Sequence, residues 1–346
     1  MLLLLLALVP QHAVSASFEG AHSAAQEPAR IERLLGAMGT GLRIEVEAPR
    51  RAVALRASEA AAREVEATEQ RLSTWRPTSE LSRLQAAGGD WVELSAPTAH
   101  DLGAALRWSA ATAGRFDPCL GALIQAWELR GGGAVPSAST LAAAREASGA
   151  HHLLLEGTRA RLAGGASLDA GAFGKGAALD RALRASTGAG ALRTHLDLGG
   201  QHAFAGPGTW TITLAHPQDR QRAVLRLTVP AGSVATSGNS ERRWSAAGRS
   251  FGHLLDPASG APVDPDLHPW TTTVIAPVAL AADALATAAF LAPRELGSPL
   301  EDAEAALILL RVEDERLVAE LSPNFPHALE PLHPGLELRP DALERP

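Results

Sequence analysis

The sequence predicts an α+β fold in which mainly antiparallel sheets pack against helices. Helical patterns fill much of the first half of the chain, whereas segments that alternate between apolar and polar residues cluster after residue 190. Strands that follow one another directly are typical of antiparallel pairing, and a regular βαβ repeat would spread them evenly. The chain has 346 residues, 46% of them hydrophobic, so it can bury a sizeable core in one large domain or two.

The first part of the chain carries a strand and two long helices. Residues 39–49 alternate like a strand, and residues 52–72 place apolar and alanine positions at helical spacing. A second helix is predicted over 96–113, where Thr98 or Asp101 could be the N-cap.

A glycine-rich loop at 131–140 leads into the middle of the chain. Ser137 or Ser139 could cap the alanine-rich helix that follows this loop. Two short strands and a further helix are then predicted at 151–156, 159–162 and 172–186.

The second half reads as a series of strands that ends in one helix. The alternating segments at 193–200, 210–217 and 222–230 predict an antiparallel sheet. "WTTTVIAPVALAADALATAAFLA", residues 270–292, predicts a strand, a turn marked by proline and a buried helix.

The two ends of the chain differ in composition from the folded part, which is expected over residues 31–322. Residues 1–16 form an apolar run that closes on Val14-Ser15-Ala16, which is typical of a cleaved signal peptide and too short for a permanent membrane span. A disordered leader is expected at 17–30, and a proline-rich tail at 323–346 is expected to lie on the surface. These features predict export to the periplasm or the cell exterior.

Charge and motif content exclude several function classes. The net charge is −7 and the chain has no basic run, which disfavours nucleic-acid binding. The lone Cys119 cannot form an internal disulfide. An H-E-x-x-H motif is missing from the sequence, so a zinc enzyme lacks support.

Lys175 is the only lysine, because thirty of the thirty-one basic residues are arginine. Arginine carries a wide planar fork, whereas lysine carries a compact, strongly hydrated charge. A lysine that persists among glycines indicates a cramped site that needs an ammonium group. Chance survival on a solvated surface explains this residue equally well.

The stretch around Lys175, "GAFGKG", fits neither familiar phosphate motif. Asp169 stands where a P-loop requires its first glycine, and Gly176 stands where it requires serine or threonine. Gly171, Gly174 and Gly176 also run opposite to the order of the dinucleotide fingerprint. Two interpretations remain, which are an anion held at the start of a helix and a close crossing of a helix and a strand.

Two further stretches carry residues suited to catalysis. Asp283 and Thr287 stand four apart on one helix face, and their oxygens would suit Mg²⁺, although a solvated Asp283 and a packed Thr287 is the simpler alternative. His253 could act as a general base near neutral pH. Asp256 follows it in "DPASG", an ordinary turn sequence.

The order of eight such stretches along the chain resembles the ApbE family of FAD:protein FMN transferases. The resemblance covers residues 37–315 and rests on "AMGTGLRIEV", "LSTWRPTSELSRL", "GRFDPCLGALIQAW", "SLDAGAFGKGAALDRA", "HLDLGG", "VATSGNSERRW", "HLLDPASGAPV" and "TTTVIAPVALAADALATAAF". It implies an ApbE-like fold with FAD in a cleft. It also implies a Mg²⁺-dependent enzyme that splits FAD, releases AMP and attaches FMN to a threonine or serine hydroxyl of a partner protein. The partner's site would resemble Ser/Thr-Gly-Ala-Thr.

The same resemblance assigns expected roles to individual residues. Positions that match FAD contacts are Met38, Trp75, Arg115, Phe116, Asp117, Asp169, Lys175 and Leu255. Positions that match the metal ligands are the carbonyl of Ala172 and the side chains of Asp283 and Thr287. Some relatives have a third polar ligand where this chain has Ala286.

The catalytic assignments follow from this resemblance and leave alternatives open. His253 is the candidate general base, and Asp256 could either orient it or shape the turn. Lys175 could contact the nucleotide or pair with a carboxylate such as Asp169. An FAD diphosphate hydrolase that gives FMN and AMP would use the same metal site, and a non-catalytic FAD-binding carrier would need only the cleft.

Overall fold

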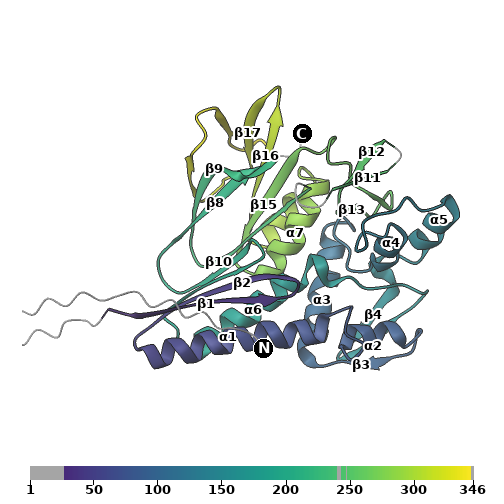
Figure 1. Ribbon diagram of the computed structural model, residues 1–346, viewed down its shortest axis with the longest axis horizontal. Coiled ribbons are helices and arrows are strands. Elements are labelled where there is room, and N and C mark those ends of the chain that lie inside the picture. Colours follow the sequence, from purple (N-terminus) through teal and green to yellow (C-terminus); the bar gives the residue numbers. More distant parts are fainter. Residues whose placement is uncertain (1–26, 240–242, 247, 344–346) are drawn as a thin grey trace, which may run out of the picture.

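The computed structural model describes residues 27–239, 243–246 and 248–343. The predicted signal peptide and most of the predicted leader lie outside this range. A central sheet organises the rest, with helices on one face and a smaller sheet on the other (Figure 1). No helix in the described range is both long enough and apolar enough to cross a membrane.

Within the described residues the central sheet has nine strands, and neighbours are antiparallel except for the last pair. Their spatial order is β1 (Ala29–Ala37), β2 (Thr40–Ala48), β6 (Arg193–Leu198), β7 (Gln201–Ala205), β10 (Gly232–Gly238), β15 (Trp270–Ala276), β16 (Ala306–Glu313), β17 (Arg316–Leu321) and β19 (Leu336–Arg339).

Smaller sheets surround this one. The three-stranded sheet on its second face runs in the order β18 (Ala328–Pro331), β9 (Asp219–Val229) and β8 (Trp210–His216). The remaining strands form three further groups, which are β3 (Val92–Glu93) with β5 (Arg159–Leu162) and β4 (Leu153–Glu156), β11 (Trp244–Ala246) with β12 (Arg249–Phe251), and β13 (Leu255–Asp256) with β14 (Ala261–Pro262).

The helices lie on the first face of the central sheet and beyond its edge (Figure 1). They are α1 (Arg51–Leu72), α2 (Glu80–Ala86), α3 (Ala96–Ala111), α4 (Gly121–Ala126), α5 (Ala138–Glu146), α6 (Gly174–Gly188), α7 (Ala279–Leu291) and α8 (Gly297–Asp302). Short 3₁₀ turns occur at Ala150–His152 and Ala170–Ala172.

The central strands are buried on both faces, which explains their nearly continuous apolar sequences. Val274 of β15 packs into the helical layer, whereas its neighbour Ile275 packs against the three-stranded sheet. Leu307 and Ile308 of β16 divide in the same way. Successive side chains of a strand point to opposite faces, so each strand joins two cores.

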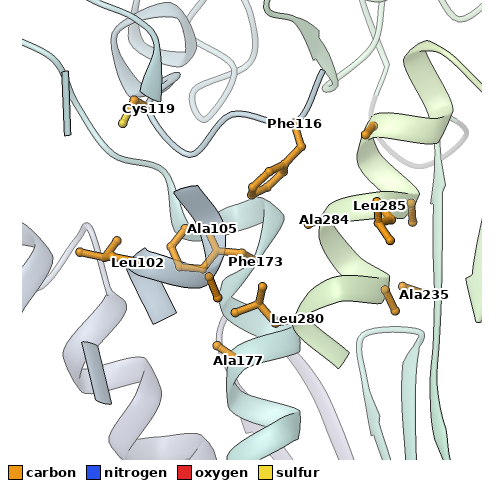
Figure 2. Close-up of a cluster of buried hydrophobic side chains, with 14 of the residues drawn as sticks. Leu102, Ala105, Phe116, Cys119, Phe173, Ala177, Ala235, Leu280, Ala284 and Leu285 are labelled. Carbon is orange, nitrogen blue, oxygen red and sulfur yellow. The ribbon is translucent and has the colours of Figure 1, made fainter. Parts of the chain in front are cut away.

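The helical layer contains a core of large side chains at the base of the cleft described below. Phe116 and Phe173 are fully buried and belong to the same cluster as Leu102 of α3 and Ala284 of α7. Figure 2 shows both rings in the space between these helices. The loop before α4 and the start of α6 are thereby fixed against α7.

The crossing of α6 and α7 requires glycine at position 176. A Cβ atom there would lie 2.5 Å from both the carbonyl oxygen of Ala279 and the Cα of Leu280. Asp180, one turn further along α6, accepts hydrogen bonds from the amides of Ala279 and Leu280 at 2.8 and 3.0 Å. It therefore caps α7, whose own N-cap residue, Val278, makes no side-chain cap. Burial raises the pKa of Asp180, and these two hydrogen bonds oppose that shift.

Most of the predicted elements are confirmed. The long helices, the capping of α5 by Ser137 and the strand–turn–helix that ends in α7 all form as expected. The N-cap expected for α3 is wrong, because Ser95 occupies that position and its hydroxyl accepts from the amide of Thr98.

Both ends of the described chain also differ from expectation. β1 already begins at Ala29, within the stretch expected to be a disordered leader. The proline-rich tail does not only cover the surface, because β18 pairs with β9, β19 pairs with β17, and Leu343 is buried.

We expect Gly176→Ala to lower the free energy of unfolding by about 1–3 kcal/mol, because the new methyl group would push apart two packed helices. Gly188→Ala, at the other end of α6, is the matched control, since a Cβ there meets nothing within 4 Å. Urea unfolding of both variants measures the difference. Equal stability of the two variants would contradict the close crossing.

Candidate active site

A cleft of about 1020 Å³ opens beside the crossing of α6 and α7. Its walls come from segments far apart in the sequence, including the β1–β2 turn, the loop after α1, the loop before α6, strands β8 and β10, and the middle of α7. All but one of the predicted site residues line it, namely Met38, Trp75, Arg115, Phe116, Asp117, Asp169, Ala172, Lys175, His253, Leu255, Asp283 and Thr287. The exception is Asp256.

A buried ion pair lies at the floor of the cleft. The ammonium of Lys175 contacts both carboxylate oxygens of Asp283, at 3.1 and 3.3 Å. The amide of Gly176 donates to the same carboxylate at 3.2 Å. Burial raises the pKa of Asp283, and the Lys175 ammonium and the Gly176 amide oppose that shift.

This arrangement resolves the two interpretations of "GAFGKG". The glycines do permit a close crossing, but the partner is helix α7 rather than a strand. The start of α6 also meets an anion, which is the carboxylate of Asp283 from the same chain. Lys175 pairs with Asp283, and not with Asp169 as one alternative suggested.

The oxygens around Asp283 fit a hard cation. Thr287 lies one turn further along α7 and donates its hydroxyl proton to the backbone carbonyl of Asp283 at 3.2 Å, so its oxygen retains lone pairs for a cation. Ala172 ends the 3₁₀ turn before α6 and lines the same cleft as these two residues. A positive charge already lies against the carboxylate. Carboxylate, hydroxyl and carbonyl oxygens are the ligands that Mg²⁺ takes, completed by water or phosphate oxygens.

The site has a single carboxylate for such a cation. Across the described residues, no group of three or more His, Cys, Asp or Glu side chains could hold a metal ion. Ala286, where some relatives have a polar ligand, is buried, and its carbonyl accepts from the Thr272 hydroxyl at 2.9 Å. A metal here would therefore depend on oxygens from water or from a bound phosphate.

One wall of the cleft is held by Arg130, which sequence reasoning missed. Its guanidinium pairs with Asp169 and donates to the Thr74 hydroxyl at 3.2 Å. It also lies 4.8 Å from the centroid of the Trp75 ring, whose side chain is largely exposed. Among thirty arginines, only its place before the glycine-rich loop distinguishes it in the sequence.

Arg115 and Asp117 of the "RFD" stretch hold the loop before α4, which forms part of the cleft wall. Asp117 accepts from the amides of Cys119 at 2.7 Å and Ala150 at 2.8 Å, and burial raises its pKa against these bonds. Arg115 pairs with Glu295, at 3.0 Å, in the turn between α7 and α8. These contacts join the loop before α4 to two other parts of the fold.

The turn between β1 and β2 is strained, and a hydrogen bond to α1 supports it. Met38 has a φ of 51°, in the left-handed region that residues other than glycine seldom adopt. Its amide donates to Glu69 of α1 at 3.0 Å, a partner that the sequence did not reveal. The Met38 side chain is thereby held at the mouth of the cleft.

His253 and Asp256 have different surroundings. His253 lies half-buried in the loop between β12 and β13 and lines the cleft, and Leu255 packs beneath it against Trp127 and Phe251. Asp256 accepts from the amides of Ala258 and Ser259 at 3.1 and 3.2 Å. Asp256 therefore shapes the turn, as one of its two expected roles requires, and its other expected role, to orient His253, stays a prediction.

Known proteins share both this sequence pattern and this fold. A sequence model of the ApbE family matches residues 38–307. An FAD:protein FMN transferase of Klebsiella pneumoniae is 29% identical in an alignment of 308 residues that covers 83% of this chain and 86% of the relative.

Two solved structures have a similar fold. The crystal structure of the ApbE protein from Thermotoga maritima has a TM-score of 0.73 and 27% identity and covers 81% of this chain and 94% of its own. The apo form of the Pseudomonas stutzeri flavinyl transferase ApbE has a TM-score of 0.73 and 25% identity and covers 86% of this chain and 95% of its own.

We expect Asp117→Ala to lower the free energy of unfolding by about 1–3 kcal/mol, because two partly buried amides lose their acceptor. Asp117→Asn retains one acceptor oxygen and should lose less. Chemical denaturation of the two variants provides the comparison. If the alanine variant is as stable as the parent protein, Asp117 does not brace the loop.

Proposed function

Because the chain belongs to the ApbE family, we propose that its cleft transfers FMN from FAD to a serine or threonine hydroxyl of an acceptor protein and releases AMP. The observation that supports this most strongly is the cleft floor, where Asp283, Thr287 and Lys175 lie beside the start of α6. Phosphoryl transfer depends mainly on positioning and on stabilising negative charge. This floor supplies both positive charge and a place for a hard cation.

The residues of the cleft have distinct proposed tasks. Asp283, Thr287 and the Ala172 carbonyl would hold Mg²⁺, which supplies neutralisation of the diphosphate charge. Met38, Trp75, Asp169 and Leu255 would bind and orient the FAD. Phe116 supports the site as a fully buried side chain, and Asp117 and Arg115 keep its loop in place.

His253 would accept the proton of the acceptor hydroxyl at an imidazole nitrogen. The hydroxyl oxygen forms a new bond to the phosphorus of the FMN phosphate, and the bond from that phosphorus to the bridging oxygen breaks. AMP leaves with the bridging oxygen. An acceptor site that resembles Ser/Thr-Gly-Ala-Thr must therefore reach the side of the cleft that His253 lines.

We also propose that the protein acts after export, on the basis of the apolar run at residues 1–16. Fractionation followed by N-terminal sequencing of the mature protein would test this. A chain that keeps residues 1–16 in the cytoplasmic fraction would contradict it.

The central test is incubation of the purified protein with FAD, Mg²⁺ and an acceptor domain that carries such a site. Mass spectrometry should show the acceptor heavier by one FMN, with AMP released in equal amount. Free FMN with AMP and an unmodified acceptor would indicate the hydrolase instead. Unchanged FAD would indicate a carrier.

We expect His253→Ala to retain FAD binding and to lose transfer by about 10²–10⁴-fold, the usual contribution of a general base. Equilibrium FAD titration and the rate of acceptor modification measure the two effects separately. Asp256→Asn is the matched control, because its remaining acceptor oxygen can still hold the turn, and it should keep most of the rate. Transfer at the full rate by the alanine variant would remove His253 from the mechanism.

A further inference from the structure

The only lysine of this chain lies against the carboxylate that would hold the metal. Lys175 contacts both oxygens of Asp283, whose side chain is only 8% exposed, while the lysine side chain is 28% exposed. An unpaired carboxylate at such a depth would be costly, because burial penalises the charged form. The ammonium group therefore supplies the charge balance that Asp283 needs in the absence of a metal.

The Lys175 ammonium and a divalent cation would compete for the carboxylate of Asp283. Both cations would contact its oxygens, and their like charges would repel each other across a few ångströms of protein. Lys175 extends from the first turn of α6 on a flexible stem, and its side chain lines the cleft. It can therefore move away from Asp283 without unfolding any element.

Other buried carboxylates in this protein are paired differently. Asp101 accepts from the Nε and Nη2 of Arg181, at 3.3 and 2.6 Å, and its side chain is 3% exposed. Glu320 is 2% exposed; its Oε1 accepts from the Nε and Nη2 of Arg311 at 2.9 and 2.6 Å, and its Oε2 accepts from Arg294 at 2.5 Å. In both pairs the guanidinium donates two hydrogen bonds from a rigid planar fork, whereas an ammonium acts as a single point of charge. Asp101 and Glu320 are thus paired with arginine, whereas Asp283 in the cleft is paired with lysine.

We propose that Lys175 is an exchangeable counter-cation of the metal site. Its ammonium group holds the Asp283 carboxylate while the site lacks metal and yields that carboxylate to Mg²⁺. This inference rests on the proposed metal site, and it explains why this one basic residue is lysine. Arginine at position 175 would clamp Asp283 and resist exchange, and a neutral side chain would leave a buried charge unbalanced.

The test is the affinity for Mg²⁺ alone, measured by isothermal titration calorimetry without FAD or acceptor. Lys175→Met removes the competing charge and should bind Mg²⁺ about tenfold more tightly than the parent chain, while Lys175→Arg should bind it about tenfold more weakly. Asp283→Asn should abolish the signal in each background, which assigns the binding to this carboxylate.

Recovery of thermal stability in Mg²⁺ is a second measurement, because the loss of a purely structural lysine would not be offset by the metal. Lys175→Met should melt at a lower temperature than the parent chain without metal and should regain most of the loss in millimolar Mg²⁺. Arg181→Met is the matched control on the same helix. It breaks another buried ion pair, so its melting temperature should fall without any added recovery from Mg²⁺, and its Mg²⁺ affinity should equal that of the parent chain.

The outcomes separate this inference from the proposed function. If the parent chain binds Mg²⁺ and transfers FMN, but Lys175→Met binds the metal no more tightly, then Lys175 is not a competing cation and only this inference fails. If neither chain binds Mg²⁺, the inference fails together with the metal site. The acceptor-modification assay then decides whether the transfer reaction survives without it.

Discussion

The close crossing of α6 and α7 is the constraint on which the site depends. Gly176 allows the backbones to approach, because any larger residue would meet Ala279 and Leu280. The same approach brings the Gly176 amide to the Asp283 carboxylate and the Asp180 carboxylate to the first amides of α7. Each helix thus satisfies polar groups of the other, and the floor of the cleft is a product of this packing rather than of a mobile loop.

The local elements could be predicted because each depends on its own residues. Alternation along 210–217 and 222–230 follows from burial of one side of each strand, and the α5 cap depends only on Ser137 and the amides that follow it. The tertiary cap on α7 could not be predicted in this way, since Asp180 lies 99 residues before the amide of Ala279. β18 was missed for a similar reason, because it pairs with β9, which stands far away in the sequence. β19 was missed although its partner β17 is close in the sequence, because it is a short edge strand in a proline-rich stretch.

The candidate site was predictable in its membership and not in its contacts. The order of the motifs brought together residues that do line one cleft, and the family match confirms the resemblance on which that list was based. The partner of Lys175 was not accessible, since Asp169 is near in sequence while Asp283 is near in space. Arg130 pairs with Asp169 instead, and only its place before the glycine-rich loop separates it from the other arginines in the sequence.

The choice between lysine and arginine carries functional information in a chain of this composition. Arginine is the prevailing basic residue here, and the one lysine lies in a buried ion pair rather than on a solvated surface, which favours a role for the difference between the two side chains. Two properties differ, which are the planar fork and the strength of hydration, and both make an ammonium easier to detach from a carboxylate. Permanent pairs such as Arg181 with Asp101 and Arg311 with Glu320 gain from the fork. A carboxylate that must change partners during a catalytic cycle is better paired with an ammonium, which has no such fork and detaches more easily. Asp283 is the buried carboxylate in the cleft where such a change would occur.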